Sequence, residues 1–186
     1  MKLKKINAVL ALLTMLFILI HIGYNSYCYL TFYYNPTLKN VTAIPVMLLT
    51  CAHGICGILA VFLMGDGTKL NTYPKQNIRT IIQRVSAALF FPLLILHLNT
   101  FNILKNSSEE GTWFKFIVVI LCQVIFYGVV IIHTAVSVTK ALITLGLLSS
   151  PTKQKKLDKF IFLAAGFILA IATFSIIKGQ LSMFLK

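Results

Sequence analysis

The sequence predicts an all-α integral membrane protein, a single domain over residues 1–186 in which five transmembrane helices form an up-down bundle. Of its residues 58% are hydrophobic and 11% are charged, and the mean hydropathy is +0.88. A water-soluble domain of this size needs far more polar surface. Five apolar stretches also reach the length of about 20 residues that crosses a bilayer, and short connections separate them.

The five predicted spans cover residues 7–33, 42–64, 79–104, 114–140 and 159–181. The first span follows Lys-Leu-Lys-Lys and has no small-residue cleavage site, so we expect an uncleaved helix that ends in an aromatic belt of tyrosines. Each later span follows a short group of turn residues, namely Asn35-Pro36, Gly65-Asp66-Gly67, Asn106-Ser107-Ser108 with Gly111, and Ser149-Ser150-Pro151. Because the connections are short, neighbouring helices are expected to run antiparallel.

The formal net charge of +13 is distributed unevenly between the two predicted membrane faces. Eleven basic residues lie at the start of the chain and around the second and fourth connections: Lys2, Lys4, Lys5, Lys69, Lys75, Arg79, Arg84, Lys153, Lys155, Lys156 and Lys159. Four lie on the other side: Lys39, Lys105, Lys115 and Lys186. The positive-inside rule predicts an inner or cytoplasmic membrane protein with a cytoplasmic N-terminus and an outer C-terminus.

Because these basic residues lie at the ends of predicted membrane spans, they do not form a folded surface that could bind a nucleic acid. The basic inner connections can instead attract anionic lipid head groups or a soluble partner. The connection from Gly65 to about Ile78 is the longest, and it is the place where a cytoplasmic partner is expected to dock.

The four histidines, His21, His53, His97 and His133, each lie in a different one of the first four spans. Ionisable side chains inside a bilayer are costly and usually functional. The cysteines, interpreted as small apolar fillers, form neither a Cys-x-x-Cys pair nor the Cys-x-x-Cys-His signature of covalently attached haem. We therefore expect the histidines to be axial ligands of two non-covalently bound haems.

The depth of each histidine, at about 1.5 Å of rise per residue, predicts how the four sort into pairs. His21 lies about 20 Å and His97 about 26 Å from the inner face. His133 lies about 26 Å and His53 about 16 Å from the outer face. The predicted outer pair is His21 with His97, and the predicted inner pair is His53 with His133. Histidines that hydrogen-bond across a helix interface without any haem are the simpler alternative.

Small and basic residues lie near the inner pair. Gly57 follows His53 by four residues and Ser137 follows His133 by four, and both are expected to leave room for a porphyrin. Arg84, with Gln83 and Ser86 beside it, and Lys140 are candidate partners of the haem propionates. Both cations are also placed to extend their side chains to the membrane surface.

The ordered set of motifs resembles the membrane subunit of succinate:quinone and quinol:fumarate oxidoreductases. The segment Gln83-Arg84-Val85-Ser86-Ala87, with His97 thirteen residues after the arginine, resembles the family's Gln-Arg-Val-Thr/Ser-Gly segment and the histidine that follows it. His53-Gly-Ile-Cys-Gly57 resembles the family's His-x-x-x-Gly. His133 followed by Ser149-Ser150-Pro151-Thr152-Lys153 resembles the fourth helix and its basic inner loop, and His21 falls where the first helix carries its ligand. The resemblance covers nearly the whole chain and favours the single-polypeptide, five-helix, dihaem type.

The resemblance implies a dihaem cytochrome b that anchors a flavoprotein and an iron–sulfur subunit on the cytoplasmic face. It implies that His53 and His133 bind the proximal haem and that His21 and His97 bind the distal haem. Electrons would pass between the iron–sulfur subunit and a membrane quinone, either menaquinone or ubiquinone. The chain itself contains no nucleophile or acid–base pair for chemistry on a soluble substrate.

The sequence departs from the family at Ala87, which replaces the usual glycine, and in having no carboxylate within the predicted spans. A transmembrane proton path that uses glutamates therefore has no counterpart here. Asn25, Asn35, Asn99 and the tyrosines offer only hydrogen bonds, so the quinone site is left unassigned.

Three alternatives stay open at this point. The first is a membrane cytochrome b of another quinone-linked dehydrogenase or reductase. The second is a small transporter with a histidine-lined path, which would usually have broken helices or internal symmetry; Pro45 near the start of the second span and Pro92 inside the third are related by no repeat. The third is a haem-free anchor for soluble subunits.

Overall fold

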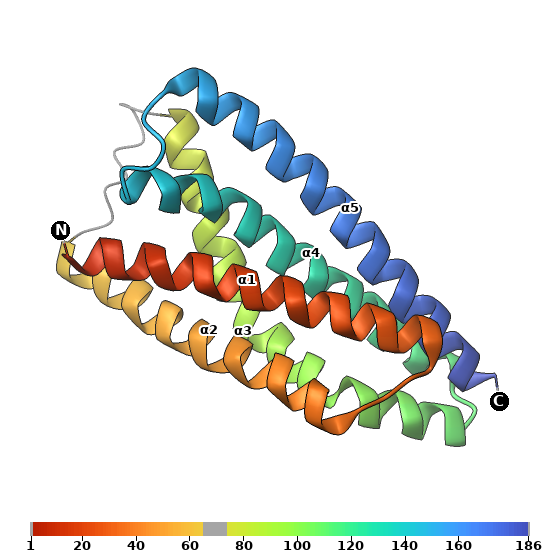
Figure 1. Cartoon of the computed structure of the whole chain (residues 1–186). Helices are drawn as coiled ribbons and strands as arrows, with labels where there is room; N and C mark the ends of the chain where they lie inside the picture. Colours follow the sequence, from red (N-terminus) through yellow and green to blue (C-terminus); the bar gives the residue numbers. More distant parts are fainter. Residues whose placement is uncertain (1, 65–73, 186) are drawn as a thin grey trace.

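The computed structural model describes residues 2–64 and 74–185 and contains five α-helices in this part of the chain (Figure 1). They are α1 (Lys2–Thr31), α2 (Pro36–Met64), α3 (Pro74–Glu109), α4 (Trp113–Thr144) and α5 (Pro151–Phe184). The described residues form no strand. Each helix is long and apolar enough to cross a membrane, so the prediction of an all-helical chain with five candidate spans is confirmed.

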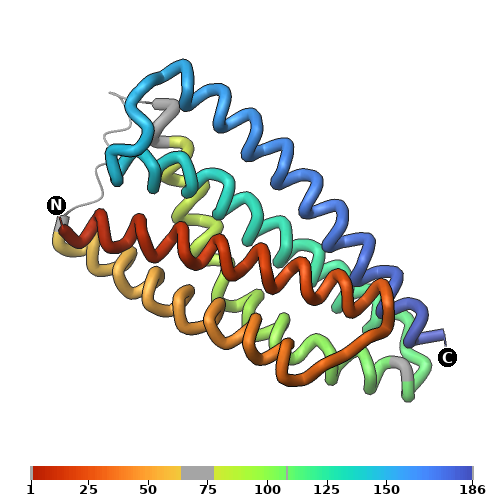
Figure 2. Tube along the Cα trace, viewed as in Figure 1, coloured from red at the N-terminus to blue at the C-terminus, as the bar shows by residue number. Residues whose placement is uncertain are grey.

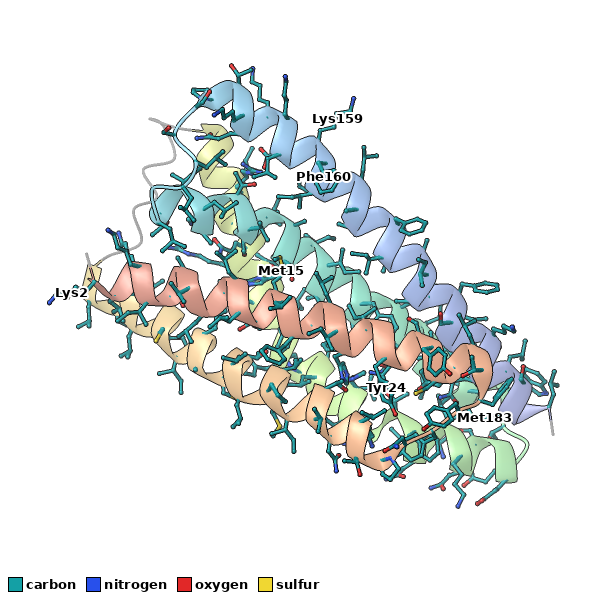
Figure 3. All side chains as sticks on the ribbon, viewed as in Figure 1. Lys2, Met15, Tyr24, Lys159, Phe160 and Met183 are labelled. Carbon is teal, nitrogen blue, oxygen red and sulfur yellow. The ribbon has the colours of Figure 1, made fainter. Side chains whose placement is uncertain are left out.

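Consecutive helices alternate in direction, and the two termini lie at opposite ends of the bundle (Figure 2). α1 packs against α2 on one side and against α4 and α5 on the other, while α3 packs mainly against α4 and crosses behind the bundle. The extensive contacts of α2 are with α1. The N-terminal end of the bundle, marked by Lys2, carries the starts of α1, α3 and α5; Met183 lies near the C-terminal end (Figure 3).

The helices extend beyond most of the predicted spans. α3 continues through Asn106-Ser107-Ser108, which was expected to be a connection, because the buried Ser107 hydroxyl donates to the carbonyl oxygen of Ile103 at 2.7 Å and stays within the helix. α5 begins at Pro151, so the four lysines expected in a loop occupy its first turns. Pro45 lies well inside α2 and not near its start. Hydropathy marks the apolar part of a helix, and polar turns extend it at either end.

The connection between α1 and α2 follows ordinary turn chemistry. α1 ends at Thr31, two residues before the end of the predicted span, because Phe32 takes a φ of 58° outside the right-handed helical region. The Asn35 Oδ1 atom then accepts hydrogen bonds from the amide N–H groups of Thr37 and Leu38, at 2.9 and 3.1 Å, and so caps the start of α2. Gly65-Asp66-Gly67, Lys69 and most of the connection expected to dock a partner lie outside the described residues.

Side-chain burial agrees with a bundle surrounded by lipid. Large apolar side chains are exposed on all five helices, whereas the most buried helix is α4 in the middle of the bundle. A compact apolar cluster of Leu104, Phe116, Val119, Ile120 and Ile176 joins α3, α4 and α5 near the C-terminal end. α1 and α5 also approach closely, since a Cβ added to Gly179 would lie 2.6 Å from Cδ1 of Tyr29.

Candidate functional site

The four histidines meet in two pairs. The ring centres of His21 and His97 are 6.5 Å apart, and those of His53 and His133 are 6.3 Å apart, with the ring planes inclined by 79° and 67°. These are the same two pairs that helical depth predicts. We call His21 with His97 the outer pair and His53 with His133 the inner pair.

Each pair connects the two helical hairpins of the bundle. The hairpin of α1 and α2 supplies His21 and His53, and the hairpin of α3 and α4 supplies His97 and His133. The inner pair lies nearer the N-terminal end, because His133 comes late in α4, which runs toward that end. All four side chains are partly buried.

The separations fit two imidazoles on opposite sides of one metal ion. A metal–imidazole nitrogen bond is about 2.0 Å long, and the ring centre lies about 1.1 Å behind the nitrogen, so two opposed rings have centres about 6.2 Å apart. Edge-to-face contacts between two rings fall in the same range of distances, and both pairs have that relative orientation. The spacing of both pairs is also suited to bis-histidine ligation, as in b-type haem.

A buried polar chain fixes the tautomer of His97. Thr100 donates its hydroxyl proton to the carbonyl oxygen of Leu96 at 2.9 Å, so it accepts the amide N–H of Gln123. The Oε1 atom of Gln123 therefore faces His97, whose Nδ1 lies 2.8 Å away and must donate. The proton sits on Nδ1, and Nε2 keeps the lone pair that a metal needs.

His21 has the same tautomer. Thr42 donates to the carbonyl oxygen of Lys39 at 3.0 Å, so the contact of 3.5 Å between its Oγ1 and Nδ1 of His21 requires a proton on that nitrogen. The Nε2 atom lies 2.9 Å from the amide nitrogen of Asn25, which can only donate. The lone pair of His21 Nε2 thus accepts a hydrogen bond from a side chain one turn along the same helix.

In the inner pair the orientation of His133 is set by α3. Its Nδ1 lies 3.1 Å from the carbonyl oxygen of Gln83, which can only accept, and 2.9 Å from the hydroxyl of Ser86. The Nδ1 atom therefore carries the proton, and Nε2 keeps its lone pair as in His97. Ser86 in turn donates to the carbonyl oxygens of Ile82 and Gln83.

His53 is held differently from the other three. The backbone of Asn7 in α1 makes a hydrogen bond with its imidazole, while its Nδ1 atom is buried and has no hydrogen-bond partner among the described residues. The same is true of Oγ1 of Thr50, one turn earlier in α2, and of Oδ1 of Asn7 in α1. Buried polar atoms normally find partners, so this group of unpaired atoms marks a polar environment beside the inner pair that the helices alone do not satisfy.

Small residues lie close to the inner pair. A Cβ added to Gly57 would lie 3.9 Å from the amide nitrogen of Asn7 in α1. Gly54, next to His53, faces α3, with Phe91 Cζ at 3.5 Å from its added Cβ. Ser137 is buried and accepts a hydrogen bond of 2.9 Å from Gln83. Ser137 therefore links α4 to α3 through this hydrogen bond.

The two candidate propionate partners lie beside the inner pair. Lys140 donates to Oε1 of Gln83 at 3.1 Å and lies 3.4 Å from Oγ1 of Thr80. The charges of Arg84 and Lys4 are close enough to act on that of Lys140. Positive charge from α1, α3 and α4 is thus collected at the N-terminal side of this pair, and Gln83 links Lys140 to the carbonyl that holds His133.

Aromatic side chains fill the depth between the two pairs. Phe90 and Phe126 are 5.6 Å apart between ring centres, and Phe126 lies 4.8 Å from His97. Along α4 the outer pair is marked by Gln123 and the inner pair by His133, which are ten residues and hence about 15 Å apart. The pairs are separate sites with an apolar layer between them.

Sequence reasoning did not find Gln123, Thr100 and Thr42 as partners of the histidines. A signal existed for Gln123, since a lone glutamine in an apolar span usually hydrogen-bonds across a helix interface. Which histidine it meets depends on the rotation of α4 against α3, which the sequence does not specify. The contact between His21 and Asn25 follows from a spacing of four residues in one helix.

No group of three or more His, Cys, Asp or Glu side chains able to hold a metal ion occurs in residues 2–64 and 74–185. A haem iron needs at most two protein ligands, because the porphyrin supplies the other four. Compared with protein-family models, with curated proteins and with solved structures, the chain matches none of them.

Proposed function

We propose that this chain is a dihaem cytochrome b membrane subunit that carries electrons through the bilayer by two bis-histidine b haems. The observation that carries the proposal is the presence of two histidine pairs, at 6.5 and 6.3 Å between ring centres, each formed across two helical hairpins. When bound, a haem iron supplies one-electron redox chemistry.

The side chains around each pair have a defined task. Gln123 and the carbonyl of Gln83 hold His97 and His133 with the proton on Nδ1, which leaves Nε2 unprotonated and oriented. Such partners raise the basicity of a ligating imidazole and fix its ring. The surrounding apolar helices exclude water, and with the ligands they set the redox potential.

The propionates of the inner haem are assigned to the N-terminal side of the inner pair. Lys140 and Arg84 supply positive charge there, and Gln83 supplies a further polar contact. A charged group that leaves water needs such charge-assisted partners.

The resemblance to succinate:quinone and quinol:fumarate oxidoreductases suggests the partners. The N-terminal end of the bundle carries the basic starts of α1, α3 and α5, which favours a cytoplasmic location for that end. A flavoprotein and an iron–sulfur subunit would dock there, and a membrane quinone would exchange electrons with the haems. A related cytochrome b of another dehydrogenase would use the same two pairs with different partners.

Two observations favour this proposal over the other classes. The five described helices run without a break, whereas transporters usually bind their substrates at discontinuous helices. A haem-free anchor gives no reason for the four imidazoles to meet in two pairs, at 6.5 and 6.3 Å between ring centres.

Counting haems in paired variants tests the assignment. Purified protein in detergent is expected to contain two b haems per chain by pyridine haemochrome, and each single histidine-to-alanine variant is expected to contain about one. The double variant H21A/H97A removes one pair and should keep one haem. The matched variant H21A/H133A damages both pairs and should keep none. Folded protein that contains no haem, or double variants that lose haem equally, would contradict the proposal.

The partner class is tested by the electron donor. In native membranes succinate is expected to reduce the haem signal that depends on this chain, and H53A/H133A membranes should lose the inner-haem part of it. Reduction by another respiratory substrate, and not by succinate, would assign the chain to a different dehydrogenase.

A further inference from the structure

The Asn25 side chain makes a hydrogen bond with Nε2 of His21, the nitrogen that a haem iron would need. Its amide nitrogen lies 2.9 Å from Nε2 of His21 and also 2.9 Å from the carbonyl oxygen of the same residue. The two N–H groups of one amide can make both bonds at once. His21 is therefore held by Thr42 on Nδ1 and by Asn25 on Nε2.

The other histidines with an assigned tautomer do not share this arrangement. The hydrogen bonds that described residues make with His97 and His133 all involve Nδ1. Asn25 thus makes the outer pair different, because its hydrogen bond is to Nε2, the nitrogen that would bind iron. Since the amide donates to Nε2, it also keeps that nitrogen unprotonated.

We propose that Asn25 is a positioning residue that competes with iron for Nε2 of His21. This inference rests on the proposed function and deepens it. In the haem-free protein Asn25 keeps His21 in the tautomer that can bind a metal and satisfies its lone pair within the membrane. When haem enters the outer pair, the bond from Asn25 to Nε2 breaks, while its bond to the carbonyl oxygen of His21 can persist.

The competition lowers the affinity of the outer pair for haem by the net strength of one hydrogen bond. Such a bond corresponds to about a 2- to 12-fold change in an equilibrium constant. Asn25→Ala is therefore expected to tighten haem binding at the outer pair by about this factor. Alanine also favours the helix, so the variant is expected to fold.

A haem titration in a background with one functional pair measures this effect. The His53→Ala variant retains the outer pair, and ferric haem is titrated into its haem-free form in detergent while the Soret absorbance is followed. Asn25→Ala is compared in this background with Asn99→Ala. Asn99 is a matched control because its amide makes the same type of bond, to the carbonyl oxygen of Ile95 four residues earlier, and it is exposed.

Tighter binding in N25A with no change in N99A supports the proposal. Equal or weaker binding in N25A overturns it, and weaker binding would mean that Asn25 supports the bound haem. If the folded His53→Ala protein and the unmodified chain both take up no haem, the proposed function fails together with this inference. A nitrogen NMR spectrum of labelled histidines in the haem-free protein gives a second readout, since the Nε2 signal of His21 should shift in N25A and not in N99A.

Discussion

Replacing Gln123 by leucine should weaken haem binding at the outer pair and leave the inner pair unchanged. Gln123 is fully buried, and its Oε1 atom accepts the Nδ1 proton of His97 at 2.8 Å. Leucine has a similar size but no acceptor, so His97 keeps a buried N–H group with no partner. Thr100 loses its donor in the same change.

The cost of leaving a buried donor unpaired is about 1–3 kcal/mol. That cost falls on the haem-free and the haem-bound protein alike, so it lowers stability more than affinity. The loss of affinity follows from the loss of a partner that orients a metal-bound histidine, which typically costs about 10- to 100-fold.

Transfer of haem to excess apomyoglobin measures the loss from each pair as a separate kinetic phase. In Q123L the phase of the outer pair should accelerate by about 10- to 100-fold. Gln180→Leu is a matched control, because Gln180 is another buried glutamine and donates to Tyr29 at 2.9 Å, away from the histidines. An unchanged outer phase in Q123L, or equal acceleration in both variants, would refute the role assigned to Gln123.

Two further predictions concern stability, measured as the midpoint of thermal unfolding by circular dichroism in detergent. Gly179→Ala should lower the midpoint by an amount corresponding to about 1–3 kcal/mol, because its Cβ would lie 2.6 Å from Tyr29. Gly166→Ala in the same helix, where nothing lies within 4 Å, should not lower it; equal effects would contradict the close packing of α1 and α5. Asp158→Ala should lower stability by about 1–3 kcal/mol, because the Asp158 carboxylate pairs with Arg79 of α3 at 2.7 Å and accepts a hydrogen bond from Thr139 of α4 at 2.6 Å. Glu110→Ala is the control and should lower stability by at most about 1 kcal/mol, because the Glu110 carboxylate is exposed. A smaller effect at Asp158 than at Glu110 would show that the ion pair does not hold α5 in place.

The sequence predicts the helices and the histidine pairing for the same reason. An α-helix rises by a constant amount per residue, so the position of His97 or His133 in its span gives a depth without any knowledge of packing. The alternation of helix direction then places two histidines in each half of the bundle. The ring contacts of the two pairs agree with this estimate.

Features that depend on helix rotation or on polar helix ends are not predicted in this way. The contact of Gln123 with His97 depends on the rotation of α4 against α3, which hydropathy does not give. Ser107 was expected in a connection, but a serine can satisfy its hydroxyl within its own helix and let the helix continue. Hydropathy reports the boundary of the hydrocarbon and not the last hydrogen-bonded turn.

The division of both pairs between the two hairpins has a thermodynamic consequence. If each pair holds one haem, that haem ties the hairpin of α1 and α2 to the hairpin of α3 and α4, and ligand binding adds to the free energy of their association. A free haem concentration of 100 times Kd would stabilise the assembled bundle by about 2.7 kcal/mol for each site. The resistance of this chain to degradation would then follow the haem supply of the cell, and neither site would exist until the second hairpin had joined the first.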